Sequence, residues 1–205
     1  MIIGISGKAQ SGKDTVGSML AYFIATNGDF DFERYVEFNV DDYWYKHASF
    51  LQHKYFAYAL KECVANLLHT TVDNLNLESY KRSTINWLDN MSVRELLQKF
   101  GTGIRNSVDE NFWVKCLLTD YTEKQAWIIT DVRFTSEIQA LQDRNAILIR
   151  VNNTRINSGN HVSETELDNC NEFNYYINNE GTLKDLFMEV YTVYKSLKSL
   201  GRVGE

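Results

Sequence analysis

The segment from Gly7 to Thr15, GKAQSGKDT, constrains this chain more than any other part of its sequence. It contains a glycine, four residues, a second glycine and a lysine, and it lies between the apolar run MIIGIS and a helical pattern that begins at Lys13. Glycines let a backbone turn tightly enough to point its N–H groups at a phosphate, and a helix N-terminus adds positive potential. A strand, a glycine loop and a helix in this order predict a loop that binds a nucleoside triphosphate.

One letter of this loop departs from the usual pattern, because Asp14 follows Lys13 where serine or threonine is normal, and Thr15 comes one place late. An acidic residue in the first turn of a helix is favoured by the helix dipole, which is one explanation of Asp14. The other is that Asp14 binds Mg²⁺ directly or through water, with Thr15 as the alternative ligand. In both cases Lys13 is expected to reach the β- and γ-phosphates. The predicted ATP-binding residues of the loop are Gly7, Ser11, Gly12, Lys13, Asp14 and Thr15.

Further strands and helices alternate along the chain. Apolar runs at 126–130, 146–151 and 173–177 are typical of buried strands, and amphipathic patterns at 134–144 and 182–197 are typical of helices. Alternation of this kind predicts a central parallel sheet covered on both faces. The expected fold class is α/β, with the three-layer α/β/α architecture of the P-loop NTPases.

The middle of the chain is predicted to be helical. Helices are expected at 60–69, 91–101 and 111–121, and Ser92 with Glu95 forms a capping box. Arg94, Gln98 and Gly101 fall on the side of their helix opposite its apolar stripe, where a ligand could lie against bare backbone. Around this region, 35–40 is predicted as a strand, 41–45 as a turn, and 54–58 as either a strand or the start of a helix. The segment 152–171 is polar and irregular.

Composition excludes several classes of function. The net charge of −6 argues against a general nucleic-acid-binding surface. Three widely spaced cysteines form no CxxC pair, which favours reduced thiols in a cytoplasmic protein over zinc or disulfides. No apolar run has the length of a membrane span, and the N-terminal apolar run is too short for a signal peptide. The expected partners are therefore small molecules, without nucleic-acid polymers or membranes.

Several segments together resemble a known family. GKAQSGKDT, FAYALKE, VRELLQKFGT, WIITDVRFTSE and HVSETELDN occur in an order similar to that of the phage-type deoxynucleoside monophosphate kinases, from residue 1 to about 190. The resemblance implies transfer of the γ-phosphate of ATP, with Mg²⁺, to a deoxynucleoside 5′-monophosphate. It also implies a monomer or homodimer in the cytoplasm, which is the host cytoplasm if the chain is phage-encoded. Tyr58-Ala59 and Thr135 replace prolines that are frequent in the family, which affects local turns.

The resemblance further implies a division of the single domain 1–205. It places an insertion at 28–52, a helical acceptor-binding region at about 54–120 and a mobile lid at about 152–171. Because the acceptor is itself an anionic phosphate, such a kinase needs cations that hold two repelling phosphate groups together. Arg133 is predicted to bind the acceptor or the transferring phosphate, and Asp131 to hold Mg²⁺ through water or to orient Arg133. Arg94 is predicted to hold the acceptor phosphate, with Gln98 on its base or sugar.

The remaining candidates each have a structural alternative. Lys61, Arg105 and the lid residue Arg155 are candidate cations, although a surface arginine is more often solvated or weakly paired. Trp113 either stacks on a base or packs in the interior. Glu164 either contacts the nucleotide or Arg155, or belongs to a lid hinge in which Ser163 and Glu166 cap a helix. Asn178 either lines the adenine pocket or lies in an ordinary turn.

Two other functions are compatible with the same loop. One is a P-loop kinase of another phosphorylated metabolite, similar to dephospho-coenzyme A kinase. The other is a switch or motor subunit that hydrolyses ATP or GTP. A panel of phosphate acceptors separates the first from a deoxynucleotide kinase, and strong hydrolysis without an acceptor indicates the second.

Overall fold

The computed structural model describes residues 1–46, 50–156 and 161–203. The chain forms two compact units, one of Met1–Lys54 with Thr122–Glu205 and one of Tyr55–Tyr121, called unit one and unit two below. Unit two spans nearly the residues expected to form the helical acceptor-binding region. The expected insertion at 28–52 and lid at 152–171 each include positions outside the described residues, 47–49 and 157–160 respectively.

The centre of unit one is a five-stranded sheet in the order β2-β5-β1-β6-β7. Every neighbouring pair of these strands is parallel. The strands are β1 (Ile2–Ser6), β2 (Leu51–Lys54), β5 (Ala126–Val132), β6 (Ile147–Asn152) and β7 (Tyr175–Asn178). The first strand of the sequence is thus the middle strand of the sheet, and the loop that follows it opens at the carboxyl edge, where α/β proteins bind ligands.

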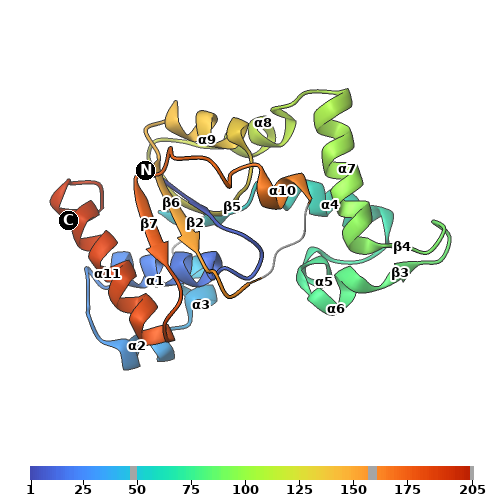
Figure 1. Cartoon of the computed structure of the whole chain (residues 1–205). Coiled ribbons are helices and arrows are strands. Elements are labelled where there is room, and N and C mark those ends of the chain that lie inside the picture. The colour runs from blue at the N-terminus through green and yellow to red at the C-terminus, as the bar shows by residue number, and fades with distance from the viewer. Residues whose placement is uncertain (47–49, 157–160, 204–205) are drawn as a thin grey trace. The chain divides into compact units, whose positions relative to one another are not determined.

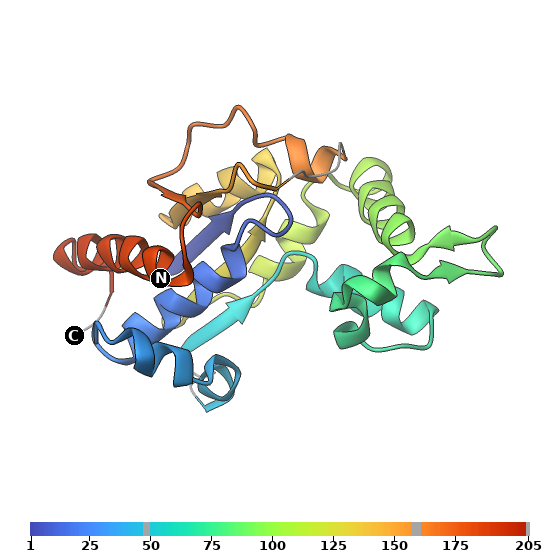
Figure 2. The same ribbon diagram turned by 60° about the horizontal axis from the view of Figure 1, so that its bottom comes forward.

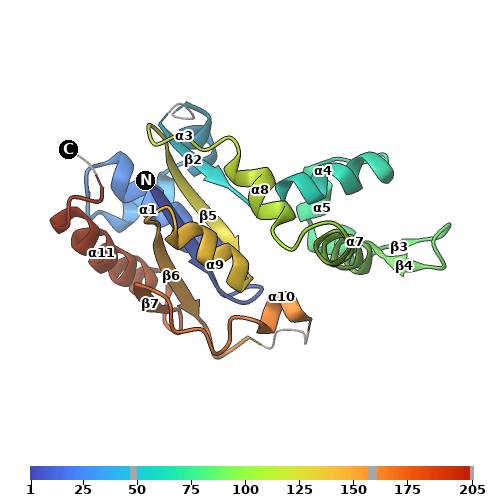
Figure 3. The same ribbon diagram turned by 90° about the horizontal axis from the view of Figure 1, so that it is seen from above.

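Helices cover both faces of this sheet, as Figures 1 and 3 show. Helices α1 (Lys13–Ala25) and α11 (Leu183–Ser199) pack together on one face, and α9 (Thr135–Gln142) lies on the other. Glycine permits close approach on each side: a Cβ on Gly4 would lie 2.7 Å from Leu141 Cδ1 of α9, and one on Gly17 would lie 2.7 Å from Thr130 Cγ2. The predicted three-layer α/β/α class is confirmed.

The segment before β2 differs from its prediction. Residues 35–40 were expected to be a strand and 41–45 a turn, but the chain forms α2 (Phe32–Glu37) and α3 (Val40–Lys46). Asp31 caps α2 by accepting from the amide of Glu33 at 3.0 Å. Two aromatic side chains of this segment pack on Tyr22 of α1, with ring centroids 5.6 Å away for Tyr35 and 5.2 Å for Phe38. Tertiary packing therefore overrides the local strand preference.

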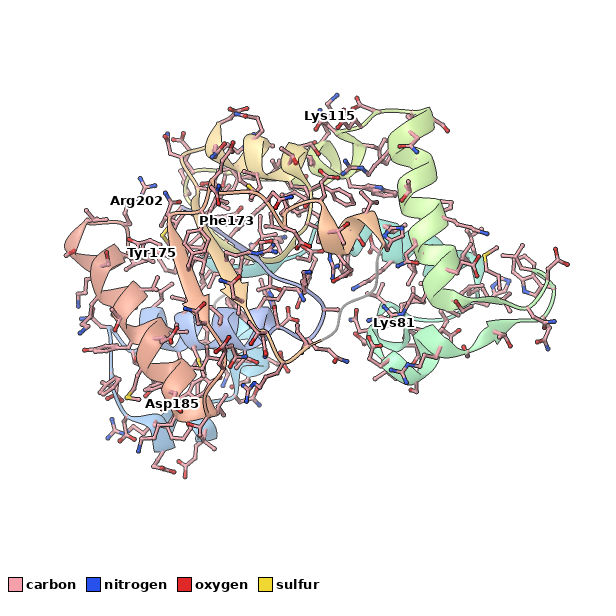
Figure 4. The ribbon with its side chains drawn as sticks, viewed as in Figure 1. Lys81, Lys115, Phe173, Tyr175, Asp185 and Arg202 are labelled. Atoms are coloured by element: carbon pink, nitrogen blue, oxygen red, sulfur yellow. The ribbon has the colours of Figure 1, made fainter. Side chains whose placement is uncertain are left out.

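The ends of two further helices of unit one are set by caps. Thr182 and Asp185, the latter labelled in Figure 4, form a capping box at the start of α11. In α10 (Val162–Thr165) the cap is His161, whose Nδ1 accepts from the amide of Ser163 at 3.2 Å. The predicted cap of Ser163 with Glu166 is wrong, because Ser163 already lies inside the helix.

Unit two is mainly helical with one short antiparallel hairpin, β3 with β4 (Figure 2). Ser92 caps α7 by accepting from the amide of Glu95 at 3.1 Å, as predicted. The expected apolar stripe of this helix packs in the core of unit two, together with Val64 and Leu75. The elements of unit two are α4 (Tyr58–Leu67), α5 (Val72–Asn76), α6 (Glu78–Arg82), β3 (Thr84–Ile85), β4 (Met91–Ser92), α7 (Val93–Ser107) and α8 (Phe112–Leu118).

The described residues contain neither a helix that could span a membrane nor a disulfide bond. Among the helices of the described residues, none is both long and apolar enough to cross a membrane. Cys63 and Cys116 are exposed thiols and Cys170 is half-buried, and all three are free.

Candidate functional site

The loop from Gly7 to Gly12 connects the middle strand β1 to helix α1. Gly12 has a φ of 95°, a left-handed conformation that favours glycine. A Cβ on Gly7 would lie 2.3 Å from Ser11 Oγ and 2.8 Å from the Val151 carbonyl oxygen, so only glycine fits there. Both glycines of the motif are thus required by the path of the backbone, which forms a tight turn in front of the helix N-terminus.

The amides that this turn can offer to an anion are those at the start of α1. The Ser11 amide donates to the Lys8 carbonyl at 3.1 Å and is engaged inside the loop. The first four amides of a helix have no acceptor within it, which leaves Gly12, Lys13, Asp14 and Thr15 as the donors. The Ser11 hydroxyl is buried without a hydrogen-bond partner among the described residues, a polar atom inside the loop that a ligand could satisfy.

Lys13 lies inside a group of charged side chains. Its side chain is buried, and burial followed by the charge of Arg133 lowers its pKa, while Asp14, Asp131 and Glu164 act in the opposite direction. These four charges act on the pKa of Lys13 because all of them lie near its side chain. The structure therefore brings together Lys13, Arg133, Asp131, Asp14 and Glu164, which come from three separate segments of the sequence.

Strand β5 ends at Val132. Asp131 is the residue before that end, and Arg133 is the first residue after it. The turn that carries Arg133 is fixed by Glu137, a buried carboxylate on α9. Glu137 Oε2 accepts from the amide of Arg133 at 2.6 Å and from that of Phe134 at 3.1 Å. The sequence analysis did not identify Glu137, although an acidic residue at the third position of a helix is a recognisable capping signal.

Glu164 of α10 contacts the phosphate loop and Arg133 at the same time. Arg133 Nη1 pairs with Glu164 Oε1 and donates to the Ser163 carbonyl at 3.2 Å. Glu164 Oε2 accepts from the Ala9 amide at 2.7 Å. The partner of Glu164 is thus Arg133, and not Arg155, which was one of the contacts considered for it. A carboxylate already occupies donors that are suited to a phosphate oxygen.

Two more acidic residues bind α10 and the segment after it to the same edge. Glu166 Oε1 accepts from the Thr135 amide at 2.8 Å, and Asp168 pairs with Lys8 at 3.0 Å and Arg150 at 3.4 Å. A small, open pocket lies here, lined by Lys8, Arg133, Arg150 and Glu164 among others. The spacing of three acids in HVSETELD was the signal for these contacts, but their partners could not be read from sequence.

Arg155 and Asn178 lie near the other side of the loop. Arg155 Nη2 donates to the carbonyls of Asn179 at 3.1 Å and Gly181 at 3.4 Å. Asn178 accepts from Asn152 at 3.3 Å, while its neighbour Asn179 donates through Nδ2 to the Ser11 carbonyl at 2.9 Å. Asn179, which the sequence analysis missed, is therefore the asparagine that contacts the phosphate loop.

Oxygen ligands suited to Mg²⁺ are present beside Lys13. Asp14 is exposed and its Oδ1 accepts from the Thr130 hydroxyl at 2.5 Å, while Thr130 Oγ1 lies 2.9 Å from His53 Nε2. In the described ranges no group of three or more His, Cys, Asp or Glu could hold a metal ion alone. Mg²⁺ in nucleotide sites usually binds one or two carboxylates together with phosphates and water. Asp14 with Asp131 or Thr15 fits that requirement.

A comparison with known families decides the class of protein. A family model described as deoxynucleotide monophosphate kinase matches residues 26–190. The chain belongs to the deoxynucleotide monophosphate kinase family. The match begins beyond the Gly7–Thr15 loop, so the loop geometry and the family match are separate observations. The resemblance noted in the sequence is confirmed, and the chain is a kinase, a phosphotransferase. A search of curated proteins found no match.

In this member of the deoxynucleotide monophosphate kinase family, unit two carries the remaining predicted cations. Lys61 of α4 donates to Asn76 Oδ1 at 2.7 Å and lies 5.7 Å from the ring centroid of Tyr55. Arg94 of α7 pairs with Glu78, which also pairs with Lys81 at 3.1 Å. Gln98 and Arg105 follow Arg94 on the same helix at spacings of four and eleven residues, which place them on one face.

Part of that face is covered within unit two. Trp113 is buried and its indole N–H donates to the Gly101 carbonyl at 3.1 Å. A Cβ on Gly101 would lie 3.0 Å from Leu60, so this glycine allows α4 and α7 to pack closely. These contacts favour packing, the structural alternative for Trp113, over stacking on a base. They also show that the backbone at Gly101 is not bare.

Proposed function

We propose that this kinase transfers the γ-phosphate of ATP to a deoxynucleoside 5′-monophosphate, giving a deoxynucleoside diphosphate and ADP. The observation that carries the proposal is the position of Lys13, buried beside Arg133 where the glycine loop enters α1. Burying an ammonium among other charges is costly unless a ligand or a counter-charge compensates it. The triphosphate of ATP is that ligand, and the family match supports the acceptor class.

The triphosphate would bind to main-chain donors first. The amides of Gly12, Lys13 and Asp14 point from the start of α1, and the helix dipole favours an anion there. Lys13 Nζ would bridge the β- and γ-phosphates. Arg155 and Asn179 would border the nucleotide on the side of β7, where Asn178 stays a candidate for the adenine pocket.

The transfer itself requires little acid–base chemistry. An oxygen of the acceptor phosphate attacks the γ-phosphorus, and the bond from that phosphorus to the β–γ bridging oxygen breaks, leaving its electrons on ADP. Charge spreads over the transferring group, so catalysis depends on alignment and on cations. Arg133 would neutralise this charge. Asp14, with Asp131 or Thr15, would hold Mg²⁺, which neutralises and orients the phosphates when it is bound.

Glu164 competes with phosphate for two donors. Its carboxylate accepts from the Ala9 amide and pairs with Arg133, and like charges that share one site repel. We therefore propose that nucleotide binding displaces Glu164 from at least one of them. Glu164 lies in the predicted lid segment, and in this proposal its displacement frees Arg133 to bind the phosphates.

The acceptor would bind the cations of unit two. Arg94 is proposed to hold the acceptor phosphate, with Gln98 on the base or sugar and Lys61 and Arg105 as additional cations. Arg94 and Glu78 are about half-exposed and their ion pair is solvated, so exchanging it for a phosphate contact costs little.

An acceptor panel tests this function. ADP release is measured with ATP and the four deoxynucleoside monophosphates, their ribonucleotide counterparts and dephospho-coenzyme A. Turnover with one or more deoxynucleotides is expected. Turnover only with metabolite phosphates would support the alternative kinase, and strong hydrolysis without acceptor would support a switch or motor.

Lys13→Ala provides the control for the panel. Phosphoryl transfer should be abolished while the circular dichroism spectrum and the cooperative melting transition are kept, because Lys13 contacts phosphate and is not needed for the core. Near-normal turnover of this variant would show that Lys13 is not the phosphate ligand.

A further inference from the structure

Thr130 connects strand β5 to helix α1 through both branches of its side chain. The residue is fully buried. Its methyl group packs so closely on Gly17 of α1 that a Cβ added to this glycine would lie only 2.7 Å from it. Its hydroxyl donates to Asp14 Oδ1 at 2.5 Å. Asp14 precedes Gly17 by three residues and therefore lies on the same face of α1. One threonine thus holds the helix backbone with its methyl group and the loop carboxylate with its hydroxyl.

His53 supports Thr130 from the neighbouring strand. In the pairing of β2 with β5, His53 is opposite Ile128, and Thr130 lies two residues further on the same face of the sheet. His53 Nε2 is 2.9 Å from Thr130 Oγ1. On its other side the imidazole lies against Trp44 of α3, with ring centroids 5.2 Å apart. The ring is therefore held in place from two directions.

The direction of these hydrogen bonds follows from the number of protons. A threonine hydroxyl has one hydrogen, and Thr130 donates it to Asp14, whose carboxylate can only accept. The contact between His53 and Thr130 then needs a hydrogen on Nε2, which donates to Oγ1. Burial lowers the pKa of His53 and favours the neutral ring, although Asp14, Asp131 and Asp41 oppose this shift.

We infer that Thr130 and His53 are positioning residues that hold the Asp14 carboxylate in one orientation toward the Mg²⁺ of the bound nucleotide. The inference rests on the proposed function, because it takes Asp14 as a metal ligand. Thr130 occupies one oxygen of the carboxylate, and the second oxygen stays available to the cation or its water. An exposed aspartate would otherwise rotate among several rotamers, and fixing it beforehand lowers the entropy cost of binding.

The experiment compares ADP affinity of the full chain with Mg²⁺ and with EDTA, by calorimetry. Thr130→Val keeps the branched shape against Gly17 and removes the hydroxyl, whereas Thr130→Ser keeps the hydroxyl. We expect the Mg²⁺-dependent gain in ADP affinity to fall about tenfold in Thr130→Val, the usual size of such outer-shell effects. It should stay near the wild-type value in Thr130→Ser, and the affinity for metal-free ADP should be unchanged in both.

His53 provides a second pair of variants. His53→Phe keeps a ring beside Trp44 without a donor and should reduce the same Mg²⁺-dependent gain. His53→Gln keeps an N–H donor and should restore part of it. If the network served only to stabilise the sheet, these substitutions would lower the melting temperature and leave the Mg²⁺-dependent gain at its wild-type value, which would overturn the inference.

The failures of the inference and of the proposed function are distinguishable. Wild-type protein that does not bind ADP contradicts both. Wild-type protein that binds Mg²⁺-ADP more tightly than ADP, with the same gain in Thr130→Val, contradicts the inference alone. A long-range ¹H–¹⁵N spectrum of the wild type, which needs no variant, should show the neutral Nε2–H form of His53. The Nδ1–H form would overturn the inference, because Thr130 would then have to donate to His53 in place of Asp14.

Discussion

The candidate site residues of the two units are held by contacts of different kinds. In unit one, contacts join distant parts of the sequence: Ala9 with Glu164, Ser11 with Asn179, and Asp14 with Thr130. In unit two, Lys61 and Arg94 donate hydrogen bonds to side chains that are only 15 and 16 positions away in the sequence. The Arg133–Glu164 pair has side-chain exposures of 26% and 12%, against 42% and 47% for Arg94–Glu78.

This difference indicates different contributions to the reaction. The groups at the carboxyl edge of the sheet in unit one are brought together by the fold itself, and the Arg133–Glu164 pair is partly desolvated. Electrostatic stabilisation is strongest in such surroundings. The cations of unit two are solvated and replaceable, which suits recognition of an acceptor. Variants of unit one should therefore change kcat, and variants of unit two should change KM for the acceptor.

Of the two arginine variants, Arg133→Ala is expected to have the larger effect. Its charge matters most in the transition state, and an arginine in this role contributes roughly 10³-fold or more to kcat in other phosphoryl-transfer enzymes. We expect kcat to fall by at least about 10²-fold, with little change in KM for ATP. Steady-state ADP release measures both constants. A loss confined to the apparent affinity for ATP would contradict the proposed role.

A smaller effect is expected from Arg94→Ala. Loss of one solvated phosphate contact should raise the acceptor KM by about tenfold, with kcat nearly unchanged, because ground-state and transition-state binding weaken together. Lys99→Ala is a matched control, since Lys99 lies on the same helix in an exposed pair with Glu95. Equal effects of the two variants would show that Arg94 has no specific contact with the acceptor.

The smallest effect is on stability. Burial lowers the pKa of Lys13, so its charged form costs stability, and this cost is relieved as pH rises toward the unfolded pKa. Lys13→Met should therefore raise the melting temperature at neutral pH by a few degrees, where about 1 kcal/mol corresponds to roughly 2–4 °C. The gain should shrink with increasing pH below about 10.5.

Arg94→Met is the control for this prediction. It should change the melting temperature little, since exposed ion pairs contribute about 0–1 kcal/mol. A lower melting temperature for Lys13→Met would contradict this view of Lys13.

The sequence predicted the parts of the site that depend on local order. The loop from Gly7 to Lys13 lies between an apolar strand and an amphipathic helix, and this pattern alone placed it at the edge of a parallel sheet. Arg133 follows a buried strand, so its position was also predictable. Periodicity and the rule that ligands bind at the carboxyl ends of parallel strands give these two positions. The role of Arg133 on a phosphate was implied by the family resemblance and stays a prediction.

The supporting residues could not be predicted in this way. Thr130, His53 and Asn179 contact partners that become neighbours only after the sheet has formed. His53 and Thr130 are 77 positions apart, and Asp14 and Thr130 are 116 apart. The strand prediction for residues 35–40 failed for the related reason that Tyr35 and Phe38 pack on Tyr22, a contact that local propensity does not contain.

The most direct test of the account observes the loop amides themselves. In ¹H–¹⁵N spectra of the full chain, addition of Mg²⁺-ADP should shift the amide signals of Gly12, Lys13 and Asp14 downfield, because each donates to a phosphate oxygen, while AMP should leave them nearly unchanged. If saturating ADP leaves these three signals in place and shifts others, the phosphates bind elsewhere and the assignment of the loop is wrong.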